Sequence, residues 1–383
     1  MTLLKIVQNA ELALQKMQNK KQKIFIIAGE VSGDVLGARI MREMHDTEFV
    51  GIGGENMVRA GLCPLFPMSD LSVMGAVEVL AHARTLTRRI KQTVRAIIDE
   101  KPDVVLTIDS PGFAQSVITR VRKLDIAHSI RFHHVVAPQV WAWRPGRAKK
   151  YAKLFDKLYA FFDFEVPYFT KYGLETMAVG HPISDGLVGH KTISQKEKVV
   201  TFVPGSRMSE VKRLLPLYRD VVGKLGSGYK YVVPTVETTR DYVANFVRNW
   251  SVPVELVKSS KRYDVYAKTY VAIAASGTVS AELAMLHVPT IVVYKMNPIT
   301  FWLARHVVNI RWVSLVNILL NKTVYPELLG GNATCKNVVR EFEKLTVATN
   351  RTKTKRLLAS ADKLWRHDKT SPARLIANDL RSL

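Results

Sequence analysis

Residues 271–294 read V-A-I-A-A-S-G-T-V-S-A-E-L-A-M-L-H-V-P-T-I-V-V-Y, and this stretch decides the fold class. The apolar run Val271–Ala275 is typical of a strand that is buried on both faces of a sheet. The small residues 276–278 interrupt it, helical composition follows up to Leu286, and a second apolar, β-branched run ends at Tyr294. The pattern predicts a strand, a turn, a helix and a second strand, which is the repeating unit of a parallel α/β sheet.

The turn in this stretch is a candidate anion site. Backbone N–H groups and the hydroxyls of Ser276 and Thr278 would stand at a helix N-terminus, where an anion such as a diphosphate is favoured. Glu282 lies one helical turn further on and can accept both hydroxyls of a ribose. The same residues also fit an ordinary strand–helix connection with a Ser/Thr N-cap and a solvated Glu. The local sequence leaves both interpretations open.

The same alternation of strands and helices extends over the chain. Apolar strand candidates lie at 23–28, 49–52, 104–108, 133–137, 158–162, 176–179, 199–203, 229–233, 254–256 and 290–293. They predict two doubly wound domains, each with its ligand crevice at the C-terminal ends of the strands. If the two crevices face each other, a donor and an acceptor can bind on opposite sides and closure can exclude water. The expected segments are an extension at 1–22, domains at 23–190 and 191–345, and basic C-terminal helices at 346–383.

Composition narrows the classes of partner. The 383 residues carry 56 Lys and Arg against 33 Asp and Glu, a net charge of +23, which predicts an anionic partner. No zinc-finger spacing or aromatic RNA-binding pattern accompanies this charge, so a membrane surface is a better candidate than nucleic acid. Cys63 and Cys335 lie far apart without metal spacing, which predicts a reducing compartment. The chain contains no apolar run of transmembrane length, and its N-terminus does not resemble a signal peptide.

Three polar residues that follow apolar stretches are candidates for chemistry. Arg207 ends the turn P-G-S-R after strand 199–203 and can bind a diphosphate, or it is an exposed loop arginine. Asp109 follows strand 104–108 and can act as a general base on an acceptor hydroxyl, or it is a turn or N-cap residue. Asn317, in S-L-V-N-I-L-L, can reach a nucleotide or cap a helix.

Two further stretches of the first domain have a functional and a structural interpretation. Residues 29–37, G-E-V-S-G-D-V-L-G, match neither the dinucleotide fingerprint nor the Walker loop, but this strand-to-helix turn can hold the anionic head of an acceptor. Residues 71–80, L-S-V-M-G-A-V-E-V-L, would bury one helix face in the core or form an exposed apolar flap for acyl chains or a bilayer. His133, His134 and His181 are possible bases, although histidines in such places are more often structural.

The motifs form an ordered set. They read A-G-E-V-S-G-D-V-L-G-A (28–38), G-I-G-G-E-N-M (51–57), L-S-V-M-G-A-V-E-V-L (71–80), D-S-P-G-F (109–113), P-Q-V-W-A-W-R (138–144), V-G-H-P (179–182), P-G-S-R (204–207), A-S-G-T (275–278) and S-L-V-N (314–317). From about residue 23 to the C-terminus this set resembles the lipid-A-disaccharide synthase family, inverting glycosyltransferases of the GT-B type. Asp163 stands where that family usually has Pro.

The resemblance implies a reaction. UDP-2,3-diacylglucosamine and 2,3-diacylglucosamine 1-phosphate would give lipid A disaccharide 1-phosphate and UDP, a step of lipid A and lipopolysaccharide biosynthesis. It implies no cofactor and no metal, because helix dipole and arginine serve at the diphosphate. The enzyme would be a peripheral protein on the cytoplasmic face of the inner membrane and would not bind nucleic acid. A homodimer and C-terminal helices that return to the first domain are both possible.

The resemblance also assigns the candidate residues. Domain 23–190 would bind the acceptor and domain 191–345 the UDP-sugar. The residues implied to hold UDP are Arg207, Ser276, Gly277, Thr278, Glu282 and Asn317. Asp109 would be the base for the acceptor 6-hydroxyl, and Glu30, Ser32 and Met74 would line the acceptor side. Because inversion needs one displacement, a second carboxylate at nucleophile distance is not required.

Two other functions compete with this interpretation. One is a different UDP-sugar enzyme on the same scaffold, either an epimerase or another lipid-linked glycosyltransferase; turnover of a UDP-sugar without an acylated acceptor would favour it. The other is a non-catalytic binder of anionic surfaces, driven by the net charge of +23. Tight nucleic-acid binding without affinity for UDP would favour that function.

Overall fold

The chain folds into two compact units. The structure is a computed structural model that describes residues 21–71, 76–142, 144–187, 198–295, 311–365 and 370–383. The first unit runs to Val179 and also includes Thr370–Leu383, whereas the second unit is Gly180–Lys369. The chain therefore leaves the first unit after β7 and returns to it for its last helix. No described helix combines the length and apolar character that a membrane crossing requires.

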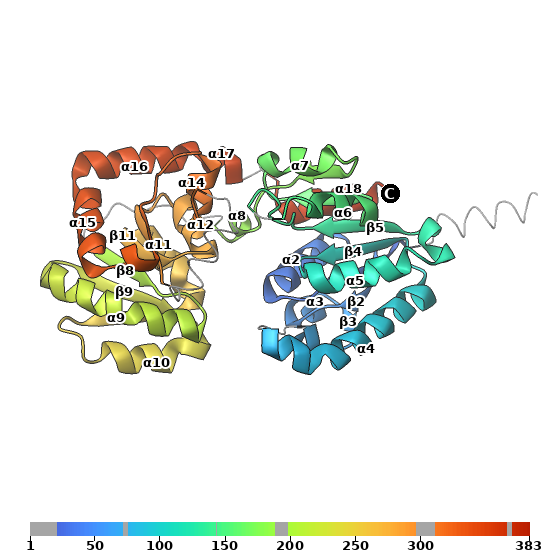
Figure 1. Cartoon of the computed structure of the whole chain (residues 1–383), viewed down its shortest axis with the longest axis horizontal. Coiled ribbons are helices and arrows are strands. Elements are labelled where there is room, and N and C mark those ends of the chain that lie inside the picture. The colour runs from blue at the N-terminus through green and yellow to red at the C-terminus, as the bar shows by residue number, and fades with distance from the viewer. Residues whose placement is uncertain (1–20, 72–75, 143, 188–197, 296–310, 366–369) are drawn as a thin grey trace, which may run out of the picture. The chain divides into compact units, whose positions relative to one another are not determined.

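The first unit contains a parallel sheet with the strand order β3-β2-β1-β4-β5-β6-β7 (Figure 1). Its strands are β1 (Lys23–Ala28), β2 (Glu48–Ile52), β3 (Cys63–Pro64), β4 (Val104–Ile108), β5 (Arg131–Val135), β6 (Lys157–Ala160) and β7 (Glu175–Ala178). The order runs outward from β1 in both directions, which is the doubly wound arrangement predicted from the sequence. All the C-terminal strand ends therefore lie along one edge of this sheet.

Helices cover both faces of this sheet because both sides of its central strands are apolar. Phe25 and Ile27 of β1 join one core cluster, and the alternate residues Ile24 and Ile26 join the other. The helices are α2 (Val31–Glu43), α3 (Glu55–Arg59), α4 (Ala76–Glu100), α5 (Pro111–Val121), α6 (Arg147–Leu154), α7 (Pro167–Thr170) and α18 (Pro372–Arg381).

The second unit repeats the architecture with the strand order β10-β9-β8-β11-β12-β13, again all parallel. The strands are β8 (Val199–Val203), β9 (Lys230–Thr235), β10 (Val254–Lys258), β11 (Thr269–Ala275), β12 (Thr290–Tyr294) and β13 (Glu327–Leu329). The helices are α8 (Ile183–Gly186), α9 (Met208–Leu225), α10 (Glu237–Val247), α11 (Arg262–Lys268), α12 (Thr278–Met285), α14 (Leu315–Leu319), α15 (Cys335–Thr346), α16 (Ala348–Ser360) and α17 (Asp362–Trp365). The strand at the centre, β11, and its neighbour β8 carry the two turns that the sequence singles out.

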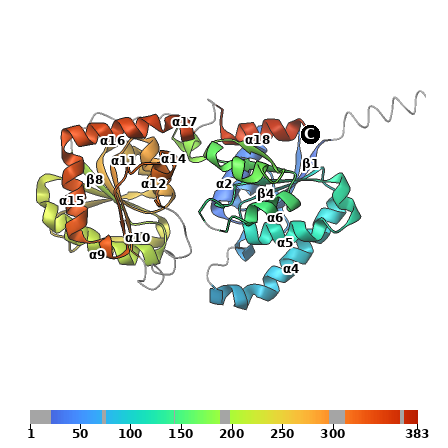
Figure 2. The ribbon, with the colours of Figure 1, turned by 45° about the horizontal axis from the view of Figure 1, so that its top comes forward.

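The structure divides the C-terminal segment differently from the expected range 346–383. Helices α16 and α17 stay in the second unit, and α18 alone packs in the first unit against α2, as Figure 2 shows in red and blue. Asp379 of α18 accepts a hydrogen bond from the Tyr159 hydroxyl at 2.6 Å and pairs with Lys157 Nζ at 2.6 Å. The division between the units also falls after Val179 rather than near residue 190.

The glycine-containing stretch 29–37 is mostly helix rather than turn. Helix α2 begins at Val31, so only Gly29 and Glu30 connect it to β1. The glycines inside α2 allow close packing, since a Cβ on Gly37 would lie 2.7 Å from the sulfur of Met57. The expectation that residues 29–37 form a turn is therefore wrong beyond Glu30.

Candidate active site

The turn after β11 has the geometry that its residues predict. Gly277 takes a φ of 146°, a backbone conformation that side-chain-bearing residues rarely adopt, and it occupies the N-cap position of α12. Ser276 is half-buried and Thr278 is exposed. The turn therefore presents hydroxyls and the free N–H groups of a helix start at the C-terminal edge of the sheet.

A second turn of the same kind follows β8. Gly205 has a φ of 97°, and a Cβ there would come within 2.3 Å of Glu210. Arg207 is the N-cap residue of the 18-residue helix α9. Its guanidinium is largely exposed and lies 3.3 Å from a carboxylate oxygen of Glu210, its neighbour one helical turn on. An exposed pair of this kind is weak, so the guanidinium is available to a stronger anion.

The two turns border one cavity of about 440 Å³. They meet because β8 and β11 are adjacent parallel strands. Five of the residues predicted to bind the donor line this cavity together, namely Arg207, Ser276, Gly277, Thr278 and Glu282. Arginine, helix N-termini and small residues at a parallel strand edge form a cavity suited to a nucleoside diphosphate.

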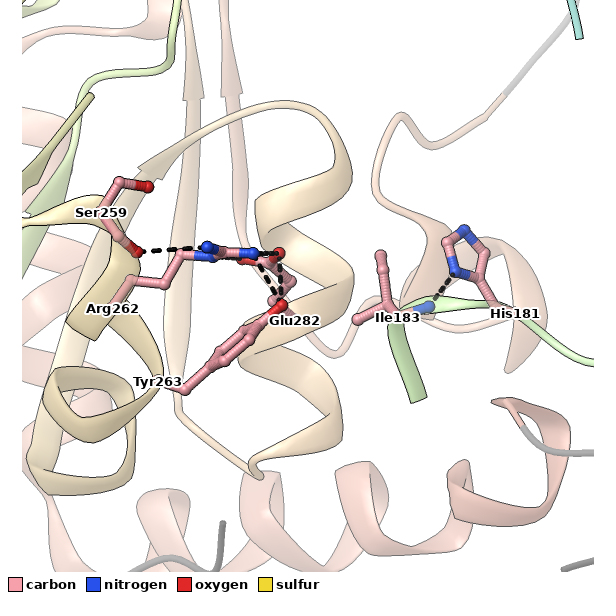
Figure 3. Close-up of polar contacts among 6 residues, drawn as sticks. All are labelled: His181, Ile183, Ser259, Arg262, Tyr263 and Glu282. Atoms are coloured by element: carbon pink, nitrogen blue, oxygen red, sulfur yellow. Dashed lines mark hydrogen bonds and ion pairs between the residues drawn. The ribbon is translucent and has the colours of Figure 1, made fainter. Parts of the chain in front are cut away.

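Glu282 is held by two residues that the sequence analysis missed (Figure 3). Glu282 is 8% exposed, and its carboxylate accepts hydrogen bonds from Arg262 at 3.1–3.3 Å and from the Tyr263 hydroxyl at 3.0 Å. Arg262 is in turn anchored by the Ser259 carbonyl at 3.1 Å. Burial, with Glu282 adding to it, raises the pKa of Tyr263 to about 12, so the phenol remains a hydrogen-bond donor.

No sequence signal distinguished Arg262, because basic residues are abundant throughout the chain. Arg262 meets Glu282 only through tertiary structure. Helix α11 precedes β11 and α12 follows it, so both helices reach the same edge of the sheet. A carboxylate that accepts hydrogen bonds from a guanidinium and a phenol hydroxyl is held in one orientation. Glu282 is therefore a preformed acceptor rather than the solvated side chain that the alternative interpretation requires.

Asn317 lies elsewhere, in the interior. It is fully buried within α14, and its side-chain amide donates to the Tyr325 carbonyl at 2.8 Å and to Glu327 at 2.9 Å. Its side-chain oxygen accepts from the backbone N–H groups of Val324 and Tyr325. Ser314 is the N-cap residue of α14. Asn317 thus neither caps a helix nor presents its side chain to a ligand, and it instead fixes the segment that enters β13.

Asp109 stands at the C-terminal edge of the first unit's sheet, directly after β4. Asp109 and Ser110 both have left-handed backbone conformations, with φ of 53° and 47°, which are uncommon outside glycine. Burial raises the pKa of the Asp109 carboxyl, and a hydrogen bond from the Ser110 backbone opposes this only in part. Ser110, not Asp109, occupies the N-cap position of α5, and it makes no side-chain cap. A carboxylate with a raised pKa at a strand edge is a candidate general base.

The predicted acceptor residues share this edge in part. A Cβ on Gly29 would lie 2.0 Å from the Ser110 hydroxyl, so the short turn after β1 touches the residue next to Asp109. Glu30 and Ser32, which follow Gly29, are exposed. Residues 72–75 of the predicted apolar flap, which include Met74, lie outside the described residues. The flap prediction is therefore not tested.

The three candidate histidines, His133, His134 and His181, are held by structural contacts and burial. Burial lowers the pKa of His133 to about 4 and that of His134 to about 3, so both rings are neutral near pH 7. His133 Nδ1 lies 3.0 Å from the Tyr159 hydroxyl. Burial also lowers the pKa of His181 to about 4, and its Nδ1 accepts a hydrogen bond from the Ile183 backbone N–H (Figure 3). We therefore do not assign any of these three histidines as the base for the acceptor hydroxyl.

The comparisons with known proteins agree with this arrangement. The sequence model of the family described as Lipid-A-disaccharide synthetase matches residues 24–376. The chain belongs to the lipid-A-disaccharide synthase family. The synthase of Rhodospirillum centenum is 41% identical over 340 residues, 84% of each chain, and that of Gluconobacter oxydans is 38% identical over 91% of this chain and 86% of its own. The protein is thus a glycosyltransferase of lipid A disaccharide formation, which uses a UDP-sugar and a sugar phosphate.

Solved structures confirm the fold class. Acinetobacter baumannii MurG matches with a TM-score of 0.63 over 95% of this chain and all of its own, at 12% sequence identity. The S. aureus MnaA–UDP co-structure matches with a TM-score of 0.62 over 94% of this chain and 96% of its own, at 13% identity. At such low identity these likenesses show the fold alone, which is the predicted GT-B type with two Rossmann-like domains.

Proposed function

We propose that the chain transfers a diacylglucosamine unit from UDP-2,3-diacylglucosamine to the 6-hydroxyl of 2,3-diacylglucosamine 1-phosphate, with inversion at the anomeric carbon. The observation that carries this proposal is the cavity in the second unit, where Arg207, the turn 276–278 and Glu282 come together. Arg207 and the N–H groups of α12 would bind the diphosphate, and Glu282 would accept the ribose hydroxyls. The membership of the family supports the identity of both sugars.

Asp109 is the proposed base. Its carboxylate would take the proton of the acceptor hydroxyl as that oxygen attacks the anomeric carbon and the bond to UDP breaks. Arg207 and the helix N-terminus would stabilise the negative charge that develops on the departing diphosphate. Neither step requires a metal or a cofactor, and we propose none.

We further propose that the enzyme works at the inner face of the inner membrane as a peripheral protein. Both proposed substrates carry acyl chains, and the net charge of +23 would attract the protein to an acidic lipid surface. A homodimer is compatible with the family, but the proposed mechanism does not depend on it.

The reaction is tested by UDP release from the wild-type enzyme and the Asp109→Asn variant, with both acylated sugars supplied. General-base catalysis is worth about 10²–10⁴-fold, so kcat should fall by roughly that factor while UDP affinity stays unchanged. The wild-type rate should fall as the pH drops through a pKa above the ordinary Asp value, because the base must be deprotonated and burial raises the pKa of Asp109. A nearly unchanged rate for Asp109→Asn would contradict the assignment of Asp109 as the base.

An epimerase is the second candidate, because UDP-GlcNAc 2-epimerases share the fold, including that of Neisseria meningitidis bound to UDP-GlcNAc (TM-score 0.59, 12% identity). Incubation with UDP-GlcNAc alone separates the two functions. The glycosyltransferase should leave it unchanged, and formation of an epimer would favour the alternative.

A further inference from the structure

A second cavity, of about 270 Å³, lies wholly within the first unit. It opens at the C-terminal edge of the adjacent strands β4 and β5, between the segments that follow them. Asp109, His134, Gln139, Arg147 and Tyr151 contribute its polar lining. Of this group, only Asp109 and His134 are candidates from the sequence. The remaining residues have no part in the mechanism described so far.

Arg147 brings an unneutralised positive charge to this cavity. It is the first residue of the eight-residue helix α6, and its side chain is half-buried. Within the described part of the chain its guanidinium forms no ion pair with a carboxylate. A planar guanidinium at a helix start is well suited to a phosphate, which it can bind through two parallel hydrogen bonds.

Tyr151 supplies the second, independent observation. It lies one helical turn after Arg147, its side chain is fully buried, and its hydroxyl lacks a well-formed hydrogen bond among the described residues. Burial raises the pKa of this phenol, although nearby Gln115 and Arg147 act in the opposite direction. The hydroxyl is therefore protonated, and it lines the cavity without a hydrogen bond of ordinary geometry to a described residue. Buried polar groups are rarely left so, and a bound ligand is one explanation for such a group.

The other polar groups define what kind of ligand fits. His134 is neutral, and its Nδ1 lies 2.6 Å from the Thr107 hydroxyl, so it adds no charge to the cavity. Asp109 is the only acid among the described residues that line it. The site thus offers a cation and a hydroxyl donor at one place and a carboxylate at another. A phosphate monoester that also carries an alcohol has the matching groups.

We propose that Arg147 and Tyr151 form the subsite for the phosphate of the acceptor sugar, which holds the acceptor so that its hydroxyl reaches Asp109. This inference rests on the proposed function, which supplies an acceptor with a 1-phosphate and a reacting 6-hydroxyl. The phosphate is on C1 and the hydroxyl is on C6, which is attached to C5. Because C1 and C5 flank the ring oxygen, the two groups lie toward the same end of the sugar, and one cavity can hold both. Arg147 and Tyr151 are binding residues in this arrangement, and Asp109 remains the base.

The test compares two acceptors in the same detergent, 2,3-diacylglucosamine 1-phosphate and the same sugar without its phosphate. For Arg147→Gln we expect kcat/KM with the phosphorylated acceptor to fall at least about tenfold, the usual scale of a lost charged hydrogen bond. With the unphosphorylated acceptor it should stay within about threefold of wild type, since the lost contact is absent there. Lys150→Gln, an exposed neighbour on α6, should change neither value.

The Tyr151→Phe variant distinguishes a ligand-binding role of the hydroxyl from a role in the stability of the fold. It removes a hydroxyl that has no well-formed internal partner, so the thermal midpoint should stay equal to or above that of wild type. Its kcat/KM should nevertheless fall for the phosphorylated acceptor alone. UDP affinity, measured by calorimetry, should be unchanged in both variants, because neither residue lines the donor cavity.

The possible outcomes distinguish a failure of the proposed phosphate subsite from a failure of the proposed reaction. Equal losses on the two acceptors, or no loss on either, would overturn the subsite while leaving the glycosyltransferase intact. If wild type releases no UDP with either acceptor, the proposed function fails, and binding of glucosamine 1-phosphate by calorimetry then decides the subsite. Binding that Arg147→Gln abolishes would support it, and absence of binding to wild type would refute it.

Discussion

At the scale of single residues, Glu282 is oriented by its neighbours in the donor cavity, the cavity between the 204–207 and 276–278 turns where we propose that the UDP-sugar binds. Its Oε1 atom receives hydrogen bonds from Tyr263 and from two nitrogens of Arg262, whereas Oε2 receives one from Arg262. The four contacts come from three donor groups, because the Nε–H of Arg262 is shared between the two oxygens. A carboxylate has about four acceptor positions, so the remaining free capacity lies on Oε2. The ion pair therefore orients Glu282 and leaves Oε2 able to accept a hydrogen bond from a ligand hydroxyl.

The substitution Glu282→Gln should weaken UDP binding by roughly 10–100-fold, since hydrogen bonds to charged groups are worth about 1.5–3 kcal/mol. The amide removes the charge that Arg262 neutralises and replaces one acceptor oxygen with a donor. Isothermal titration with UDP measures the effect. Glu255→Gln is the matched control, because Glu255 is exposed on β10 and does not line the donor cavity. Unchanged affinity in Glu282→Gln would contradict the assignment to ribose.

At the scale of elements, a single aspartate ties α2 to α3. Asp34 of α2 is 1% exposed and accepts hydrogen bonds from the backbone N–H groups of Gly54, Asn56 and Met57 and from the Asn56 side chain, all at 2.8–3.0 Å. It thereby caps the N-terminus of α3 from another helix. Burial acts to raise the pKa of Asp34, but these hydrogen bonds outweigh it and the pKa is lowered.

Asp34→Ala should lower the free energy of unfolding by about 2–4 kcal/mol, because it removes a cap and leaves buried donors without a partner. The contribution of this carboxylate is fully present above the unfolded-state pKa of about 3.9 and is lost as the pH falls through the lower folded-state value. Urea titrations at neutral and acidic pH should therefore differ less for the variant than for wild type. Asp46→Ala, at an exposed turn after α2, is the control and should change stability little.

Elements with long apolar runs were predictable, and short ones were not. The ranges predicted for β1, β4 and β8 coincide with the observed strands, because buried parallel strands are continuous apolar runs. β3 has two residues and β13 three, too few to produce a pattern.

At the site, the turns after β8 and β11 were predictable from their glycines. The positions of Arg262 and Tyr151 depend on how helices pack, which local sequence does not contain.

At the scale of the whole molecule, the two cavities lie in different units. Every residue that lines the donor cavity belongs to the second unit, and every residue that lines the Arg147 cavity belongs to the first. The division of labour predicted for 23–190 and 191–345 stays a prediction, and it has a direct test by amide exchange.

UDP should protect amides of the second unit from hydrogen exchange, with the strongest effect in the segments around Arg207 and the 276–278 turn. Bound ligand stabilises the state to which it binds, so protection should increase with the concentration of free UDP. Mass spectrometry of peptic fragments measures it, and the Glu282→Gln variant serves as a control with reduced protection. Protection that is instead strongest around Asp109 would place the donor in the first unit.

Because the net charge is +23, the proposed membrane association should be sensitive to salt. Basic residues near an acidic leaflet are each worth about 1 kcal/mol, and the interaction decays within a Debye length of about 8–10 Å at physiological salt. Co-sedimentation with vesicles that contain acidic phospholipid should therefore decrease as salt is raised. Neutral vesicles should retain less protein at every salt concentration. Equal retention by both kinds of vesicle would attribute the association to apolar contacts alone.

The return of α18 to the first unit has a consequence for how the protein is made. A ribosome releases the amino-terminal sheet long before it translates Pro372–Arg381, yet that helix supplies Ile376 and Leu380 to the core beneath β1 and β4. The unit that is synthesised first therefore cannot complete its core until α18 has been made. Deletion of Pro372–Arg381 would damage the first unit and leave the second comparatively intact, although the deleted residues follow the second unit in the sequence.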